Sequence, residues 1–523
     1  MRILSIHLGG HDSSCCLLDN NQIELFVLEE RYSRQKHQCH LKNCLDKLLE
    51  KITRPVDIIT TPTFYRKHDP QVYLDYFFSS YNTKFNNTPK IYKDFYHHRQ
   101  HASLSFYNSG FNEAAVIVID GHGSNFFTKN ENDCKECETA YYAEYPAKFT
   151  TIYKNIICNS KEKKVKYDKI LAKRNLPIKI SLDEGIGLVY DKASFVIGNS
   201  IFDAGKAMGL SAYGNPSQDS LEKLYKKIQG NLDKNNFQNH ANYCRKVQEV
   251  TEKRALSLVT QVIEKTDAKN ICICGGYGMN ILANKKYIDK FPDRNFYFEP
   301  LSTDTGNAIG SALFFYHKHT KSKEKNPLKS TAFHGTNYPI PNIGVKTSVD
   351  DVAKEIFKSK SVGIYYGRAE AGQRALGNRS ILFNPLDIKC QEKVNAIKKR
   401  EWYRPFAAIV LKDDASKLFY DTDRFYDKFM TTCYKAKSLT QDIAPGLLHI
   451  DNTCRVQIID ENHHLYDLLI SFKQISGYGI LLNTSLNLAG EPLIETPQEA
   501  LQMLQTTELD YVYFLEKKLL CSD

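Results

Sequence analysis

The sequence feature that most constrains the fold is a recurring order of apolar strand, glycine turn and helix. Residues 114–120 (AAVIVID) are rich in β-branched side chains and lead into the glycine turn at 121–123. Residues 271–274 (ICIC) lead into the glycine pair at 275–276, and a helical pattern follows over 280–290. Such units build an α/β sheet with ligand groups at the strand ends. We therefore predict an α/β fold, and we interpret these two strand ends as markers of two similar halves that face each other across a nucleotide cleft.

The N-terminal residues predict a hairpin ahead of these strands. Residues 3–9 (ILSIHLG) and 22–28 (QIELFVL) both have the composition of strands. The polar residues at 19–21 (DNN) between them are typical of a tight turn. We expect the two strands to pair directly across this turn.

Length and composition indicate more than one folded domain. At roughly 100–200 residues per domain, a chain of 523 residues has about two to four. The 42% hydrophobic and 25% charged residues are ordinary for globular proteins and exclude wholesale disorder. Residues 317–342 hold five lysines and three prolines with little apolar pattern, which indicates a linker. We expect a first domain over 1–325, a linker over 326–345 and a second domain over 346–523.

The N-terminal residues predict a reducing compartment, and this compartment decides how the cysteines are interpreted. His7, His11 and Asp12 come too early for a signal peptide, and no apolar run approaches the roughly 20 residues of a membrane span. We therefore expect a cytoplasmic protein with reduced thiols and no membrane contact. Cys134 and Cys137 form a single C-x-x-C, so most cysteines are interpreted as structural, with a zinc clip at this pair as the alternative.

A histidine pair and two aspartates have the spacing of a metal site. On a helix, His97 and His101 share one face, with His98 turned aside. Asp120 ends the strand at 114–120, and Asp304 offers a second carboxylate. Neutral imidazoles with carboxylates suit a first-row metal such as iron, manganese or zinc. Histidines that are merely packed or exposed are the alternative interpretation.

Several glycines and two polar side chains have a pattern that would suit a nucleotide. Glycines let backbone N–H groups come close to phosphates. The sequence has neither a G-x-x-x-x-G-K-[ST] nor a G-x-G-x-x-G motif, so turn glycines without a ligand remain the alternative. The candidate nucleotide-binding residues are Gly121, Gly123, Lys206, Gly275, Gly276 and Asn280.

The order of motifs along nearly the whole chain resembles one family. The first domain contains HDSS (11–14), EERYSRQKH (29–37), HHRQHA (97–102), VIDGHG (118–123), GKAMGLSAYG (205–214), GGYGMN (275–280) and DTGNAIGSAL (304–313). The second contains GRAEAGQRALGNRSIL (367–382), IKKREWYRPFA (397–407), HIDNTCRVQ (449–457) and LLNTSLNLAGEPLIETPQEAL (481–501). Together they resemble the O-carbamoyltransferases of nodulation-factor and antibiotic biosynthesis.

This resemblance implies both a fold and an activity. The large domain would be similar to the catalytic subunit of tRNA threonylcarbamoyl-adenosine transferases, a two-lobed actin/Hsp70-like α/β fold. The smaller α/β domain would be similar to threonylcarbamoyl-adenylate synthase (YrdC-like). The second domain would make carbamoyl adenylate from carbamoyl phosphate and ATP, and the first would transfer the carbamoyl group to an acceptor hydroxyl as AMP leaves. A divalent metal is implied, with Fe(II) as the first choice and Mn, Zn or Mg as alternatives.

The resemblance also implies roles for single residues. His11 matches the general base that takes the proton of the acceptor hydroxyl, a task that suits an imidazole. His97, His101, Asp120 and Asp304 match the metal ligands. Lys398 and Arg404 have the spacing of the phosphate-binding pair and are the expected catalytic cations. The anion pocket for carbamoyl phosphate is completed by Arg455, Ser485 and Asn487.

Other cations are less closely defined. Arg31 and Lys36 would place the carbamoyl group or a phosphate, with an exposed basic patch as the alternative. Arg374 and Arg379 would belong to the anion pocket or would pair with carboxylates elsewhere in the second domain. Arginine is suited to bidentate capture of a phosphate, which is why both remain candidates.

The net charge bears on the acceptor. Of the formal +10, the segment 148–179 supplies +8, from ten Lys/Arg against two acids, with Tyr153 and Tyr167 interleaved. We expect a hydroxymethylated pyrimidine in DNA as the acceptor, with a small-molecule hydroxyl of a sugar, antibiotic or other metabolite as the alternative. The other functional hypotheses are a kinase or ATPase of the same fold and a nucleic-acid-binding protein without turnover. A solvated charged loop is the plain interpretation of the segment.

Overall fold

The chain folds into two compact units, and each unit collects separate stretches of sequence. The computed structural model describes residues 1–62, 70–125, 134–158, 160–161, 164, 177–198, 200–228, 230, 232–233, 235–322, 327–328 and 330–522. Unit 1 consists of residues 1–204, 247–279 and 289–334. Unit 2 consists of residues 205–246, 280–288 and 335–523.

Two segments that we expected in the first domain belong to unit 2. Residues 205–246 and 280–288 group there, as illustrated by Asn284 Nδ2, which donates a hydrogen bond of 2.8 Å to the Thr431 carbonyl. The last change of unit, after residue 334, falls inside the segment 326–345 that we interpreted as a linker. Composition marks that change because the linker holds three prolines, whereas the two inserted segments hold a single proline between them.

The first sheet of unit 1 contains five strands in the order β3-β2-β1-β4-β5. Its strands are β1 (Arg2–His7), β2 (Ser14–Asp19), β3 (Gln22–Leu28), β4 (Ile58–Pro62) and β5 (Lys90–Asp94). β1, β2 and β3 pair antiparallel, whereas β4 and β5 run parallel to β1. The predicted pairing of 3–9 with 22–28 is wrong, because the apolar run at β2 is itself a buried strand and lies between them.

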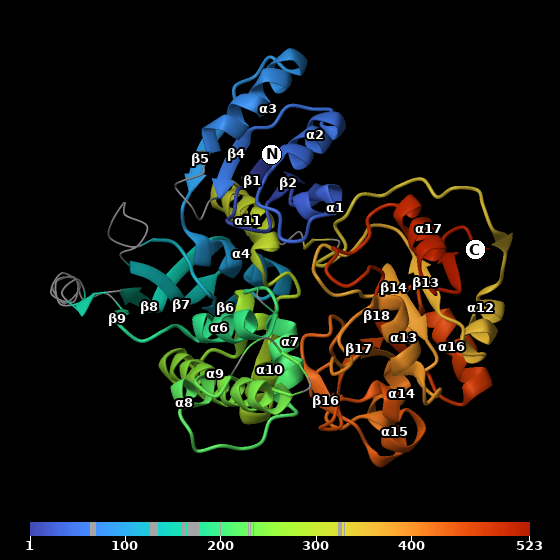
Figure 1. Cartoon of the computed structure of the whole chain (residues 1–523). Coiled ribbons are helices and arrows are strands. Elements are labelled where there is room, and N and C mark those ends of the chain that lie inside the picture. The colour runs from blue at the N-terminus through green and yellow to red at the C-terminus, as the bar shows by residue number, and fades with distance from the viewer. Residues whose placement is uncertain are drawn as a thin grey trace. The chain divides into compact units, whose positions relative to one another are not determined.

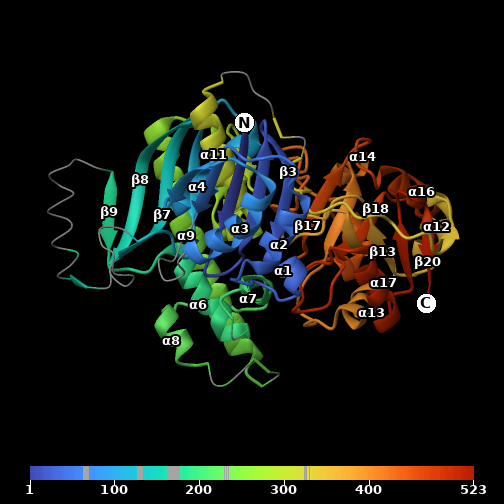
Figure 2. The same cartoon turned by 90° about the horizontal axis from the view of Figure 1, so that it is seen from above.

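The second sheet of unit 1 repeats the arrangement of the first. Its order is β11-β10-β6-β7-β8-β9, with β6, β7 and β8 antiparallel and with β10 and β11 parallel to β6. Figure 2 shows β7, β8 and β9 following one another at its edge. The strands are β6 (Glu113–Ile119), β7 (Cys134–Glu144), β8 (Lys148–Cys158), β9 (Ile178–Ser181), β10 (Asn270–Cys274) and β11 (Asn295–Phe298).

The shared strand order confirms a two-lobed α/β fold for unit 1. In both sheets three antiparallel strands are extended by two parallel ones, so the halves repeat each other. The predicted markers of the halves are nevertheless wrong. The glycine-bearing strands β6 and β10 are parallel neighbours in one sheet, with Ile271 beside Ala115. Similar strand–glycine–helix patterns arise from neighbouring parallel strands just as they do from repeated halves.

Two helices fill the space between the sheets of unit 1 (Figure 1). α4 (His97–Ser109) packs on β6 and β10, and α11 (Asn307–Thr320) packs on β1 and β2. The two helices also pack on each other, and Gly310 permits their close approach because a Cβ there would collide with the Gln100 carbonyl oxygen. The first turn of α4 and the residues ahead of α11 therefore lie in the interior of unit 1.

The remaining helices of unit 1 and the inserted segments follow from the same patterns. The expected helix over 280–290 is confirmed as α10 (Ile281–Lys290). The long helix α9 (Phe237–Thr266) contributes residues to both units. The others are α1 (Glu29–Ser33), α2 (Lys42–Lys51), α3 (Pro70–Lys84), α6 (Ile186–Gly198), α7 (Ala204–Ser211), α8 (Leu221–Tyr225), η1 (Gly276–Met279) and η2 (Asp304–Gly306).

A disulfide connects β7 and β8. Cys134 faces Cys158 in the strand register, and the two sulfur atoms are bonded. Cys134 is therefore not available as a metal ligand, so the zinc clip at Cys134 and Cys137 is wrong. Cys137 is a buried thiol whose pKa is raised by burial and by the neighbouring Glu138. The bond also departs from the expectation that all thiols are reduced.

Unit 2 is built on one nine-stranded sheet with its own core, as expected for a second α/β domain. Its order is β12-β20-β19-β13-β14-β18-β15-β17-β16. The strands are β12 (Val345–Lys346), β13 (Val362–Tyr365), β14 (Arg379–Phe383), β15 (Ala407–Leu411), β16 (Cys433–Lys435), β17 (Thr453–Ile459), β18 (Ile480–Ser485), β19 (Tyr511–Phe514) and β20 (Leu519–Cys521).

Helices cover this sheet with apolar faces. Leu468, Leu469 and Phe472 of α16 pack with Val352 and Ile356 of α12 against the central strands. The helices are α12 (Val349–Phe357), α13 (Cys390–Lys398), α14 (Lys412–Leu418), α15 (Ser438–Ile443), η3 (Pro445–Leu447), α16 (Tyr466–Ser476) and α17 (Pro497–Thr506). Within the described part of the chain, no helix has the length and apolar character needed to span a membrane.

Candidate functional site

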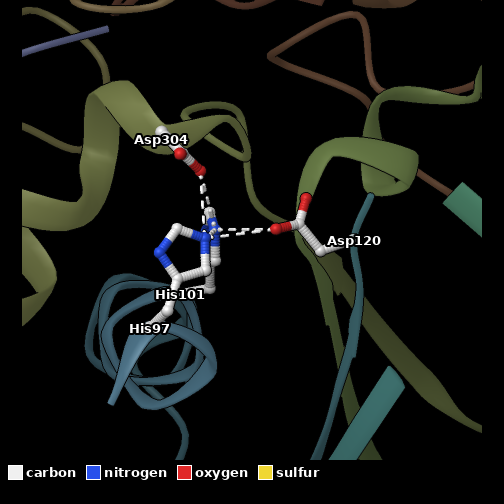
Figure 3. Close-up of side chains that lie close together, drawn as sticks. All are labelled: His97, His101, Asp120 and Asp304. Carbon is white, nitrogen blue, oxygen red and sulfur yellow. Dashed lines mark hydrogen bonds and ion pairs between the residues drawn. The ribbon is translucent and has the colours of Figure 1, made fainter. Parts of the chain in front are cut away.

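Four buried side chains in unit 1 converge on one point (Figure 3). α4 presents His97 and His101 one turn apart, Asp120 follows β6, and Asp304 opens η2. His97 Nε2 lies 3.1 Å from Asp120 Oδ2 and 3.2 Å from Asp304 Oδ1. His101 Nε2 lies 3.2 Å from the same Asp304 oxygen. One donor atom from each residue falls within 4.8 Å of the other three, so the structure brings together the four predicted metal-type residues.

The chemistry of this cluster fits a divalent first-row metal ion. Two imidazole nitrogens and two carboxylates form a compact, buried donor set with the mixed N/O character that such ions prefer. Burial disfavours a charged imidazole, but the carboxylates of Asp304 and Asp120 outweigh it and hold the pKa of His97 well above its usual range. The pKa of Asp304 is held well below its usual range, since His97 and His11 outweigh burial. The cluster therefore attracts positive charge strongly.

The glycine pair after β10 positions one member of this cluster. Gly276 N–H donates a hydrogen bond of 2.9 Å to Asp120 Oδ1. Gly275 adopts φ +83°, and a Cβ there would lie 2.5 Å from the Ile119 carbonyl oxygen, so the turn requires glycine. Ser302 Oγ donates to the Gly275 carbonyl at 2.9 Å. This predicted nucleotide turn has a direct structural task in orienting Asp120.

The glycines after β6 also have packing reasons. A Cβ on Gly123 would collide with Glu136 and His98, and a Cβ on Gly121 would collide with Asp191. His98 is turned away from the cluster, as expected, and its Nδ1 lies 2.7 Å from Thr139 Oγ1. The nucleotide role of these glycines stays a prediction.

His11 lies beside the cluster and is oriented by Asp12. His11 Nδ1 lies 2.9 Å from Asp12 Oδ2, and His11 Nε2 lies 3.7 Å from Asp304 Oδ2. Asp12 Oδ1 also accepts a hydrogen bond of 2.8 Å from His37 Nδ1. Burial lowers the pKa of His11, but the charges of Asp304 and Asp12 prevail and raise that pKa to about 9. Asp12 thus connects the predicted base to a second histidine.

Sequence reasoning missed four residues around His11. Asp12 and His37 stand inside the motifs 11–14 and 29–37, and their pairing is a tertiary contact that spacing does not show. Phe202 stacks on His37 at 3.9 Å between ring centroids and contacts His11 edge-on at 4.8 Å. Burial and the charge of Asp120 raise the pKa of Asp191 to about 7. No sequence signal marked Phe202 or Asp191.

The predicted carbamoyl-placing cations have different environments. Arg31 is buried in α1, and its Nε lies 3.4 Å from Glu30 Oε1. Lys36 is exposed and directly precedes His37. Glu30 also accepts a hydrogen bond of 3.1 Å from the His37 backbone N–H. Arg31 and Lys36 are thus attached to the segment that carries His37.

Two predicted nucleotide residues lie in unit 2. Lys206 Nζ forms an ion pair of 2.9 Å with Glu401 Oε1. Asn280 Oδ1 accepts a hydrogen bond of 3.1 Å from Ala283 N–H at the start of α10. Lys206 is therefore close to the segment of Arg404, whereas the four glycines of the set belong to unit 1.

The ammonium group of Lys398 is bound by the turn that follows β18. Its ammonium donates to Ser485 Oγ at 3.1 Å and to Asn487 Oδ1 at 2.7 Å, and also to the backbone carbonyls of both residues. The structure therefore brings together three of the five predicted anion-pocket residues. In this arrangement Lys398 organises the 485–487 turn.

Arg404 and Arg455 belong to a cluster of arginines. Burial and the charges of Arg404 and Arg455 hold the pKa of Arg400 well below its usual range. Burial and Arg455 lower the pKa of Arg374 to about 9. Burial raises the pKa of Asp427 to about 6, so this carboxylate is still mostly ionised near neutral pH and offsets one of the positive charges. This excess of buried positive charge would suit an anion, and the cluster includes Arg374, for which two roles were left open. The role of these residues as an anion pocket stays a prediction.

Arg379 has a different role. Its guanidinium is buried and donates to the backbone carbonyls of Tyr366, Asn378, Gly367 and Glu495 at 2.7–3.2 Å. It also stacks over the Tyr365 ring, 3.5 Å from the centroid. Four carbonyl partners make Arg379 a structural connection between segments of unit 2, rather than the ion-pair partner that was one of the two expectations.

The fold and these side-chain clusters define a two-unit α/β protein with a metal-type cluster in one unit and a cluster of arginines in the other. The family model for the carbamoyltransferase C-terminus matches residues 353–520, and the model for the carbamoyltransferase N-terminus matches residues 228–313. Both matches support the carbamoyltransferase family for this chain and, with it, a transferase.

Similar proteins extend the comparison over the chain. Nodulation protein NolNO of Sinorhizobium fredii is 26% identical over 461 residues, which cover 79% of this chain and 62% of NolNO. Nodulation protein U of Azorhizobium caulinodans is 31% identical over 230 residues, covering 43% of this chain and 40% of that protein. Full-length HypF in its phosphate- and nucleotide-bound form matches with a TM-score of 0.38 and 12% identity, covering 62% of this chain and 56% of HypF.

Proposed function

We propose that the chain is an ATP-dependent O-carbamoyltransferase with one half reaction in each unit. Unit 2 makes carbamoyl adenylate from carbamoyl phosphate and ATP, and unit 1 transfers the carbamoyl group to an acceptor hydroxyl. The observation that supports this most is that one chain of this family holds both the cluster of His97, His101, Asp120 and Asp304 beside His11 and an arginine-rich anion site.

The chemistry explains the need for two steps. The carbamoyl carbon is a poor electrophile because its nitrogen donates electrons into the carbonyl group. One water splits carbamoyl phosphate into carbamate and inorganic phosphate. A carbamate oxygen then attacks the α-phosphorus of ATP, pyrophosphate leaves, and the carbamoyl group gains AMP as a good leaving group. The cations of Arg404, Arg455 and Arg374 would bind the phosphates, since arginine binds them in bidentate fashion.

In unit 1, His11 would accept the proton of the acceptor hydroxyl. Asp12 accepts a hydrogen bond at Nδ1 and so leaves Nε2 as the basic atom. A divalent ion held by His97, His101, Asp120 and Asp304 would supply positive charge to the phosphate of departing AMP. Binding of the ion by Asp304 would also weaken one of the interactions that raise the pKa of His11 and so favour the neutral form that a base needs, while Asp12 continues to raise that pKa.

The acceptor is proposed from charge and exposure. The described part of 148–179 weakens the argument for DNA, since Lys148 and Lys154 pair with Glu144 and Glu136. Residues 162–163 and 165–176, with Tyr167, lie outside the described residues. A surface pocket near this segment is lined by Lys164, Lys179 and residues 180–183. We retain a hydroxymethylated pyrimidine in DNA as the first candidate and a small-molecule hydroxyl as the second.

The first prediction tests the activity itself. With ATP, carbamoyl phosphate and a divalent metal, we expect release of pyrophosphate that depends on carbamoyl phosphate. Incubation with hydroxymethylated duplex DNA, unmodified duplex and a panel of sugars and antibiotics should add one carbamoyl mass to a single acceptor class. Nucleoside-level mass spectrometry identifies which. A product that gains a phosphate mass instead would establish a kinase, and no turnover with any metal would overturn the proposal.

The second prediction concerns the metal site. We expect one divalent ion per chain, bound more tightly as pH rises, because His97 holds a proton in the metal-free protein and must lose it on binding. Calorimetry in two buffers of different ionisation enthalpy should detect this proton release. His101→Ala should abolish stoichiometric binding, whereas His40→Ala, at an exposed histidine, should leave it unchanged. Equal metal affinity in both variants would exclude the four-residue site.

A further inference from the structure

Trp402 is the single tryptophan of the chain, and it is prominently exposed. Its residue is 60% exposed, although large aromatic side chains are usually mostly buried. The indole is nevertheless held in place. It stacks on Phe237 with ring centroids 5.3 Å apart and an interplanar angle of 25°. Tyr213 and Tyr403 contact it edge-on at 5.5 Å and 6.0 Å.

These neighbours form an aromatic support within unit 2. Tyr213 also contacts Phe237 and His449 edge-on, at 5.6 Å and 5.5 Å. The Trp402 carbonyl accepts a hydrogen bond of 3.2 Å from Gln391 Nε2, which fixes the backbone at this point. An exposed aromatic ring that is already ordered loses little conformational entropy when a ligand stacks on it.

The support is adjacent to the arginine cluster. Arg404 follows Trp402 by two residues, which limits the separation of their Cα atoms to about 7 Å. Glu401, which precedes Trp402, forms ion pairs with Lys206 Nζ at 2.9 Å and with Arg404 Nη1 at 3.3 Å. The same short segment thus carries a flat aromatic surface and cations of the anion site.

We propose that Trp402 is the stacking surface for the purine base of ATP, whose phosphates bind at the neighbouring arginines. This inference rests on the proposed function. Of the two substrates proposed for unit 2, ATP alone has an aromatic ring, and carbamoyl phosphate has none. Bases stack on tryptophan through their π-faces, and exposed aromatics beside basic side chains are a recurring way to hold nucleotides.

Intrinsic fluorescence gives a direct test, because Trp402 is the source of all tryptophan emission from this chain. With excitation at the red edge of the indole band, ATP should quench the emission in a saturable way. Tripolyphosphate and carbamoyl phosphate, which carry charge without a base, should leave it unchanged. Absence of quenching by ATP, or equal quenching by tripolyphosphate, would overturn the proposal.

Variants separate stacking from folding and from the proposed function. Trp402→Ala should raise the KM for ATP on the order of tenfold and leave the KM for carbamoyl phosphate unchanged, whereas Trp402→Phe should restore most of the ATP affinity. Tyr225→Ala, at an aromatic residue that is 54% exposed in the same unit, is the matched control and should change neither value.

The outcomes distinguish the two proposals. Turnover with an unchanged KM for ATP in Trp402→Ala would contradict base stacking and leave the proposed function standing. Saturable quenching by ATP without any carbamoyl-dependent turnover would support base stacking and contradict the proposed function.

Discussion

Replacing His11 with asparagine is expected to leave carbamoyl adenylate formation intact and to lower carbamoyl transfer about 10²- to 10⁴-fold, the usual range for loss of a general base. Asparagine retains a polar group that can contact Asp12, but it cannot accept the proton of the acceptor hydroxyl. His11 belongs to unit 1, whereas the arginine cluster belongs to unit 2. Pyrophosphate release and carbamoylated product, measured in the same reaction, report the two half reactions.

A matched control keeps this result interpretable. His40→Asn alters an exposed histidine outside the cluster and should change neither half reaction. His11→Asn should also retain the thermal stability of the parent chain to within a few degrees. Loss of pyrophosphate release together with transfer would contradict the assignment of the two half reactions to separate sites.

Replacing Arg455 with methionine is expected to change activity and stability in opposite directions. Methionine retains much of the side-chain volume and removes one charge from the cluster with Arg400 and Arg404. Mutual repulsion in that cluster is evident from the lowered pKa of Arg400, which burial, Arg404 and Arg455 depress. Pyrophosphate release should fall by at least about 100-fold, since a charged partner of the phosphates is lost, while the melting temperature should stay unchanged or rise.

Arg424→Met provides the comparison. Arg424 is an exposed arginine of unit 2 whose Nε lies 3.6 Å from Asp421 Oδ1, so its removal should affect both measurements little. Melting curves and initial rates of pyrophosphate release, compared across both variants, give the test. A fall in melting temperature with unchanged activity in Arg455→Met would show that Arg455 stabilises the fold and does not bind substrate.

Local patterns predicted much of the fold correctly. The strands at 114–120 and 271–274, and the helix over 280–290, are confirmed as β6, β10 and α10, because apolar runs and glycine turns act through neighbouring residues. The strand β2 was missed, since SCCLLD has none of the β-branched or aromatic residues that mark a strand, although it is as long as β1. The grouping of 205–246 and 280–288 with unit 2 was also missed, because chain crossings leave no local pattern.

The candidate site likewise contains residues that local sequence patterns predicted and residues that they missed. Helical spacing alone places His97 and His101 on one face of α4, and the strand end places Asp120. Asp304 came from the family resemblance and a neighbouring glycine, and the structure brings it within 3.2 Å of both histidines. Phe202 and Asp191 had no signal, since nothing in their own surroundings in the sequence differs from an ordinary helix or loop.

The sequence by itself determined the α/β class, the family, and the histidines and aspartates that could form the cluster, because these depend on residue type, spacing and motif order. Only the tertiary structure decided which groups meet: the Asp12 bridge between His11 and His37, the carbonyl partners of Arg379, and the exposed indole of Trp402 beside Arg404. The Asp12–His37 and Arg379–Glu495 contacts join residues far apart along the chain. The exposure of the indole and the energies of such contacts depend on burial and distance, which exist only once the chain has folded.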